Sequence, residues 1–199
     1  MCRIFVWFFT VLSVVSLVSP VSAQTNTVVI PMFDDGPTEK TIFVTDSTYT
    51  GNLGGISGAD DKCQSAADNA VPPLPGIYKA WISRSGVPSV PTRPSFQKHD
   101  LPYKNVDGSL VATSFNDFLD NVFSGIIKSI TGSSITIRAW TGTNDDGSVD
   151  NLNCSDWSSN NMDDFGIFGV NTGGTGIADW SGDGSTRCSL LRSLYCFEQ

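Results

Sequence analysis

The chain has 199 residues, 40% of them hydrophobic, and a formal net charge of −8. This length is enough for one domain with a hydrophobic core. The acidic balance argues against nucleic acid, heparin-like polyanions and anionic lipid as partners, because each needs a basic face. All but two of the 20 acidic residues are aspartates, which favour turns, so with 19 glycines we expect a loop-rich protein with little helix.

The first 23 residues have the pattern of a secretory signal peptide. Arg3 gives a positive start, Ile4–Val18 is almost entirely apolar, and Val21–Ala23 is a small-residue cleavage site. The apolar run is shorter than the roughly 20 residues that a membrane-spanning helix needs. We therefore expect residues 1–23 to be removed, which leaves a secreted protein, extracellular or periplasmic, without membrane insertion.

Residues 24–40 are expected to form a short tail, and one domain is expected over residues 41–199. Residues 41–45 are β-branched or aromatic and predict the first strand. The next element is a helix, with Ser57 as N-cap and Asp60 three residues later, which is close to a capping-box pattern. Small apolar residues at helical spacing predict one buried stripe on it: Ala59, Cys63, Ala66, Ala67 and Ala70.

Regular elements become sparse after this helix. Residues 141–186 hold eight aspartates and no Lys or Arg, in a setting of Gly, Asn and Ser. This stretch is too irregular for regular elements and too long for an ordinary connection, so it is either a functional loop region or a flexible segment. The cysteines argue against a flexible segment. The other predicted elements are strands at 78–83, 135–141 and 190–197 and a short helix at 114–123.

Four cysteines remain once Cys2 leaves with the signal peptide, namely Cys63, Cys154, Cys188 and Cys196. In a secreted chain this even number indicates disulfides, which persist only in oxidising compartments. Four cysteines allow three pairings, and their spacing alone does not choose among them.

The end of the chain resembles the C-type-lectin-like domain. Trp180–Asp183 precedes Cys188, and Cys196 follows eight residues later in a closing strand, as do the third and fourth cysteines of that fold. Trp81–Ile82 resembles its core strand, and Cys63 matches its first cysteine. Further blocks are similar to a group of secreted, mainly bacterial domains of unknown function with an endostatin-like variant of the fold: Ile42–Thr45, Gly51–Gly55, Gly58–Cys63, Arg138–Asn144 and Leu194–Gln199.

The resemblance implies an α+β fold with a small twisted antiparallel sheet, one or two helices and a long loop region pinned by a disulfide. It also implies the pairs Cys63–Cys196 and Cys154–Cys188. In the chain-entropy model these bonds would stabilise the domain by about 5 and about 4 kcal/mol, respectively. The second bond would hold residues 141–186, where we expect the binding surface.

Candidate calcium ligands are concentrated in one turn of this loop region. Ca²⁺ takes roughly six to eight oxygen ligands, and Asn144, Asp145, Asp146 and Asp150 offer several. The alternative is that these residues cap turns and keep the surface soluble. The tripeptide by which sugar-binding C-type lectins hold calcium is missing from the sequence, which argues against that mode of binding.

Trp157, Trp180 and Asp183 are the candidate ligand-binding residues. Tryptophans in a loop rich in glycine and aspartate suit stacking on a sugar ring, although tryptophans that pin a long loop into the core are commoner. The sequon Asn153–Ser155 is centred on an expected half-cystine, so we expect no modification there.

Catalysis has little support in the sequence, so no catalytic residue is assigned. His99 is the only histidine, beside Asp100 in a proline-rich loop, and a Ser-His-Asp triad would depend on it alone. We expect a binding or adhesion module whose partner is a glycan or an extracellular protein, with calcium as the one cofactor considered. Two alternatives stay open: a structural or matrix component without a discrete ligand site, and a secreted hydrolase that uses the loop aspartates.

Overall fold

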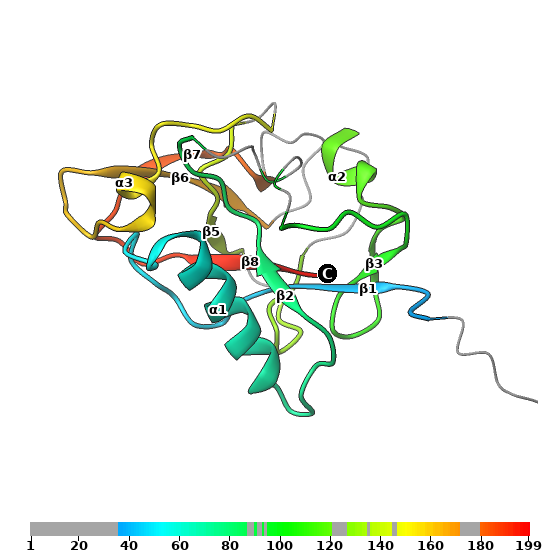
Figure 1. Cartoon of the computed structure of the whole chain (residues 1–199). Helices are drawn as coiled ribbons and strands as arrows, with labels where there is room; N and C mark the ends of the chain where they lie inside the picture. The colour runs from blue at the N-terminus through cyan, green and yellow to red at the C-terminus, as the bar shows by residue number, and fades with distance from the viewer. Residues whose placement is uncertain are drawn as a thin grey trace, which may run out of the picture. The chain divides into compact units, whose positions relative to one another are not determined.

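The computed structural model combines eight strands with three helices in the part of the chain that it describes (Figure 1). That part is residues 36–86, 90, 93, 95–120, 127–134, 136–144, 147–171 and 180–199. The fold is mixed α+β, as expected. The elements are β1 (Lys40–Val44), α1 (Gly55–Asp68), β2 (Tyr78–Ala80), β3 (Tyr103–Lys104), β4 (Leu110–Ala112), α2 (Asn116–Asp120), β5 (Arg138–Trp140), α3 (Cys154–Trp157), β6 (Phe165–Val170), β7 (Gly184–Arg187) and β8 (Ser193–Glu198).

The strands form a sheet in the order β4-β3-β1-β8-β5-β6-β7, and β2 also pairs with β8. The first and last strands lie side by side, antiparallel, with Ile42 opposite Phe197 and Val44 opposite Tyr195. β5 runs parallel to the start of β8, while β2 runs antiparallel to its end. β8 is therefore enclosed along its length, which explains why its first five residues are buried.

The two faces of β1 and β8 carry separate halves of the core. Phe197 and Ile42 point into an aromatic cluster that includes Trp81 and Trp180, whose ring centroids are 4.6 Å apart. Their neighbours in sequence, such as Phe43, point to the opposite face, because side chains alternate along a strand. That opposite face is covered by α1, which lies beside β2 and β8 in Figure 1.

α1 confirms the predicted stripe in part and does not have the predicted cap: Ala66 is only half-buried, and Ala70 lies beyond the end of the helix at Asp68. Ala59, Cys63 and Ala67 are fully buried. The helix begins at Gly55, two residues before Ser57, with Gly54 at a φ of 83° and no side-chain cap. Glycine adopts this left-handed conformation without steric cost, so the backbone itself turns the chain into the helix.

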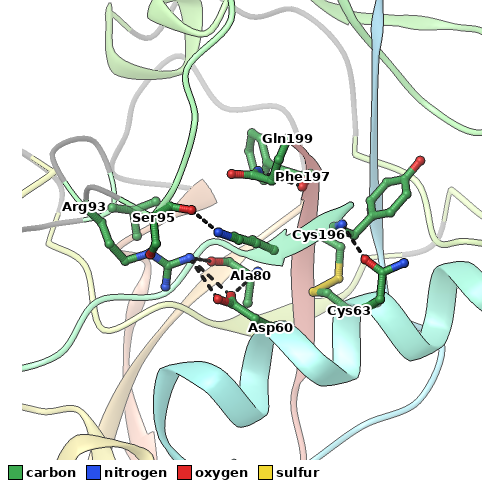
Figure 2. Close-up of polar contacts among 12 residues, drawn as sticks. Asp60, Cys63, Ala80, Arg93, Ser95, Cys196, Phe197 and Gln199 are labelled. Carbon is green, nitrogen blue, oxygen red and sulfur yellow. Dashed lines mark hydrogen bonds and ion pairs between the residues drawn. A yellow bond between two sulfur atoms is a disulfide. The ribbon is translucent and has the colours of Figure 1, made fainter. Parts of the chain in front are cut away.

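Asp60, which the sequence assigned to a capping box, instead reaches away from α1 to β2 and Arg93 (Figure 2). Its Oδ1 accepts hydrogen bonds from the backbone N–H of Ala80 at 2.9 Å and from Arg93 Nη2 at 3.2 Å. Burial raises the pKa of the Asp60 carboxyl, and the Arg93 charge opposes that rise. The carboxylate thus ties the helix to the sheet edge and to the loop that carries Arg93.

Two disulfides fasten the domain, and they join the pairs that the resemblance implies. Cys63–Cys196 links α1 to β8 across 133 positions of sequence, and Cys154–Cys188 links α3 to the residue after β7. The expected signal peptide and residues 24–35 of the tail lie outside the described ranges. Among the helices that are described, none has the length and apolar character needed to cross a membrane.

The expectation that residues 141–186 lack regular elements is wrong. This range contains α3, all of β6 and most of β7, although residues 145–146 and 172–179 are not described. β6 pairs with β5 on one edge and β7 on the other. The short strands β3 and β4 were likewise not expected. Of the other predicted elements, β1 has the predicted length but begins one residue earlier, and β2, β5 and β8 are shorter than predicted. The predicted helix at 114–123 is present as α2, and residues 121–126 and position 135 belong to the parts left undescribed.

The start of α2 gives a testable pH dependence. The Asp117 carboxylate accepts hydrogen bonds from the Thr113 hydroxyl and the Thr113 backbone N–H, both at 2.6 Å, and from Ser114 Oγ at 3.1 Å. These bonds, that from the Thr113 hydroxyl above all, lower the pKa of Asp117 below its usual 3.8. The ionised Asp117 carboxylate therefore stabilises the folded state fully when the pH is above the usual carboxyl pKa of 3.8. This contribution is lost as the pH falls through the lower pKa that Asp117 has in the folded state.

We expect Asp117→Asn to lower the free energy of unfolding at neutral pH by about 1 kcal/mol, the typical net contribution of a hydrogen bond. The variant should also lose less stability than the parent when the pH drops below the usual carboxyl range. Urea unfolding across that range measures both effects. Asp120→Asn on the exposed end of the same helix is the matched control, and equal curves for the two variants would contradict the assignment.

Candidate functional site

Two of the four predicted calcium ligands, Asn144 and Asp150, come directly after the two residues of a β-bridge. Thr143 and Val149 form a β-bridge, and Asn144 N–H donates to Ser148 O at 2.9 Å. The Asp150 carboxylate accepts the Leu152 N–H at 2.6 Å, while Asp145 and Asp146 are outside the described part. Among the residues with described positions, no three His, Cys, Asp or Glu side chains are grouped to hold a metal. Calcium at this turn stays a prediction.

Trp157 and Trp180 are not stacking platforms, because both side chains are fully buried. The Trp157 ring lies 5.9 Å from that of Trp140, and its Nε1 donates to Ser83 O at 2.6 Å. Trp180 packs in the aromatic cluster against Trp81. The apolar area of each indole is removed from water where the loop region folds onto the sheet, so the commoner core role is the one that the structure has.

Asp183 is exposed and comes directly before β7. It does not line the hollow described below. Asn153 of the sequon is almost fully buried, and its amide donates to Ser85 Oγ at 2.9 Å. Its side chain therefore serves the local fold.

The unusual feature of the loop region is α3, a single turn with left-handed backbone. The φ angles of Cys154, Ser155, Asp156 and Trp157 are 54°, 53°, 56° and 64°. The turn is closed by a hydrogen bond from Trp157 N–H to Asn153 O at 2.8 Å. For residues with a Cβ this conformation costs roughly 1–2 kcal/mol each, so surrounding contacts must hold it.

Those contacts come from the core side of the turn. Cys154 is held by its disulfide to Cys188, between two glycines that leave no room for a side chain. A Cβ on Gly51 would lie 2.3 Å from Cys154 Sγ, and one on Gly166 would lie 2.7 Å from it. Trp157 anchors the other end of the turn in the core. The left-handed path sends Cys154 and Trp157 inward and leaves Ser155 exposed and Asp156 half-buried.

The outward side of α3 borders a hollow of about 360 Å³, here called the loop pocket. Its walls come from three segments that the fold brings together: the chain after β2, the segment around α3, and the start of β6. The lining residues are Ser85, Asn151, Leu152, Asn153, Ser155, Asp156, Asp163, Asp164 and Phe165.

Carboxylates and exposed apolar groups share the loop pocket. Asp156 Oδ1 accepts the Ser85 N–H at 2.9 Å, and Ser155 Oγ donates to Asp164 Oδ2 at 3.4 Å. Asp163 is exposed, and within the described residues no hydrogen bond reaches its carboxylate. Phe165 is 40% exposed at the first position of β6. The pocket therefore combines hydrogen-bond acceptors that are not used up by the fold with an accessible aromatic ring.

This arrangement suits a polyhydroxylated ligand. Carboxylates accept strong hydrogen bonds from hydroxyl groups, and an aromatic ring offers an apolar face for the C–H side of a sugar. The sequence analysis named the region 141–186, which contains most of this lining, and Asp156, Asp163 and Asp164 as members of its acidic set, but it did not single out Phe165. The available signal was an aromatic residue directly after two aspartates.

Comparison with known proteins gives a family but no described activity. None of the curated proteins compared with the chain matches it. A family model described as "Protein of unknown function (DUF1554)" matches residues 46–173, more than half of the chain. The matched segment contains every residue that lines the loop pocket. The chain belongs to the DUF1554 family.

Proposed function

We propose that this protein is an extracytoplasmic glycan-binding module with a C-type-lectin-like, endostatin-like fold. Three observations support the fold: β1 pairs with β8, Cys63–Cys196 joins the first helix to the last strand, and Cys154–Cys188 ties down the loop region. The buried disulfides support the compartment, because such bonds persist in oxidising surroundings.

The observation that carries the proposal is the loop pocket, where exposed Phe165 lies beside Asp156, Asp163 and Asp164. In this proposal one face of a sugar ring packs on Phe165, and hydroxyl groups donate to the carboxylates. The volume of about 360 Å³ falls within the range of small-ligand sites and suits one or two sugar units. The partner is therefore the terminal or branching part of a glycan.

Rigid walls around the loop pocket favour binding even though the pocket is shallow. The disulfide, the buried Trp157 and the backbone bonds of α3 fix the pocket before a ligand arrives. Binding then costs little ordering of loops, and weak contacts of hydroxyl groups are sufficient for measurable affinity.

The test is a glycan array run on the oxidised protein with and without Ca²⁺, with Phe165→Ala and Asp164→Asn as variants. We expect glycans that bind the parent, and we expect each variant to weaken that binding by about tenfold or more. Phe165→Ala removes the aromatic contact, and Asp164→Asn removes the charged hydrogen-bond acceptor. Ile77→Ala (62% exposed) and Asp61→Asn on exposed α1 are the matched controls and should bind as the parent does.

Each other result has a definite meaning. An array without hits in either condition would refute glycan binding and favour a structural component. Hits that survive both pocket variants would refute the loop pocket as the site. Cleavage of a bound glycan that Asp→Asn changes abolish would replace the binding module with a hydrolase. Hits that require Ca²⁺ would add the predicted ion at Asn144–Asp150.

A further inference from the structure

A second hollow, on another part of the surface, concentrates positive charge in an acidic protein. It has a volume of about 290 Å³ and is lined by both Arg138 and Arg192. The whole chain has only 12 Lys and Arg residues and a net charge of −8. Two arginines on one hollow are therefore a local exception, and we call this hollow the arginine pocket.

Strand pairing places the two arginines together. Arg138 is the first residue of β5 and Arg192 directly precedes β8, and these strands run parallel with Ala139 opposite Ser193. Both guanidinium groups lie near the ring of Phe168. The distance from Cζ to the ring centroid is 5.8 Å for Arg138 and 5.2 Å for Arg192. The backbone of Arg192 is fixed by two hydrogen bonds with Tyr49, at 2.8 and 2.9 Å.

Neither arginine has a carboxylate partner among the described residues. The ion pairs found there involve Lys40, Arg93, Lys104 and Lys128. Arg192 Nη1 donates to Leu191 O at 2.7 Å, but its buried Nε has no acceptor in the described part of the chain. Asp46 also lines the pocket, yet it forms no ion pair with either arginine.

The rest of the lining adds hydroxyl groups. Thr48, Thr136 and Ser193 are also among the lining residues. Guanidinium groups only donate hydrogen bonds, and their planar forks match the oxygen pairs of phosphate-like groups. Two such cations that share a hollow and form no ion pair with a carboxylate repel each other, and a bound anion would remove that repulsion. Burial and the Arg138 charge accordingly lower the pKa of Arg192.

We infer that the arginine pocket binds the doubly negative oxyanion of a small molecule, a phosphate or sulfate group. The two guanidinium groups offer positive charge and paired N–H donors to such an anion, against the single carboxylate of Asp46 in the same lining. This inference does not depend on glycan binding. Arg138 pairs with Val170 and Arg187 pairs with Phe165, so the two pockets belong to opposite ends of β6, about 17 Å apart for a strand of this length.

Calorimetric titration with inorganic phosphate and with sulfate tests the inference, at constant ionic strength set with chloride and near neutral pH. We expect saturable binding at one site, and weaker binding by about tenfold or more in Arg138→Gln and in Arg192→Gln, because each variant removes charge-assisted hydrogen bonds. Acetate, with one charge, should bind more weakly than either. Arg187→Gln on exposed β7 is the matched control and should bind as the parent does.

Arg192→Gln also removes packing against Phe168 and Trp140, so circular dichroism must show that this variant is folded. Arg138 is exposed, and its variant keeps the test valid if Arg192→Gln unfolds. Absence of saturable phosphate and sulfate binding in the parent would overturn the inference. Binding that Arg138→Gln leaves unchanged, or that acetate reproduces, would overturn it as well.

Discussion

Replacing both Cys63 and Cys196 with alanine should lower the free energy of unfolding by about 5 kcal/mol. The bond joins positions 133 apart and connects α1 to β8, so its loss frees almost the whole domain in the unfolded state. A loss of this size is comparable to the entire stability of many domains, about 5–15 kcal/mol. Urea unfolding of the oxidised variant and parent measures it.

Removal of Cys154–Cys188 is the matched comparison. This bond spans 34 positions, so the same model gives about 4 kcal/mol. Glycan binding should distinguish the two disulfide variants more clearly than the free energy of unfolding does. Only the loss of Cys154–Cys188 removes the bond that holds α3 at the wall of the loop pocket. If the Cys63–Cys196 variant lost the smaller amount of stability, the account of which bond closes the domain would be contradicted.

Replacing Trp157 with alanine should cost about 3–5 kcal/mol, as for other large aromatic residues deleted from a core. The side chain is fully buried, and its Nε1 bond to Ser83 O would also be lost. Because Trp157 anchors the strained turn of α3, the variant should lose glycan binding even where it is still folded. Urea unfolding and the array measure the two effects.

Two further variants separate packing from binding. Trp157→Phe keeps most of the ring but leaves Ser83 O without this donor, so it should cost about 1–3 kcal/mol. Phe165→Ala, at a 40% exposed position, should change stability by only about 0.5 kcal/mol while it weakens binding. A Trp157→Ala variant as stable as the parent would contradict the buried position of this ring.

The sequence predicted the elements whose pattern is local. The β-branched run at 41–45 and the stripe of Ala59, Cys63 and Ala67 each follow the period of the element that they form. The closing strand was recognisable because β8 is buried on both faces and hence almost continuously apolar. In each case the side chains that decide the structure are within a few residues of one another.

The elements that the sequence missed depend on distant contacts. β6 contains Gly166 and Gly169, which are typical of loops, yet a side chain on Gly166 would meet the Cys154 sulfur. The left-handed turn of α3 has no glycine at all and is held by a disulfide and a buried indole from elsewhere in the fold. Local residue propensities do not depend on partners that are distant in the sequence, so they could not predict these two elements.

The candidate site was predicted by region and not by residue. The acidic stretch does carry the loop pocket, and the bond Cys154–Cys188 does hold one of its walls. The tryptophans chosen as ligand contacts are core residues, because a large indole gains more from burial than a phenylalanine at the edge of β6. Distinguishing Trp157 from Phe165 required the strand register and the turn between them.

The most direct test of the glycan site is a map of amide chemical shifts on adding an array hit to the isotope-labelled, oxidised protein. We expect the largest changes at the walls of the loop pocket, at Ser85, Asp156, Asp164 and Phe165. Amides near Gly132, which lines a different surface hollow, should not shift. Changes centred there, or at Arg138 and Arg192 alone, would contradict the assignment of glycan binding to the loop pocket.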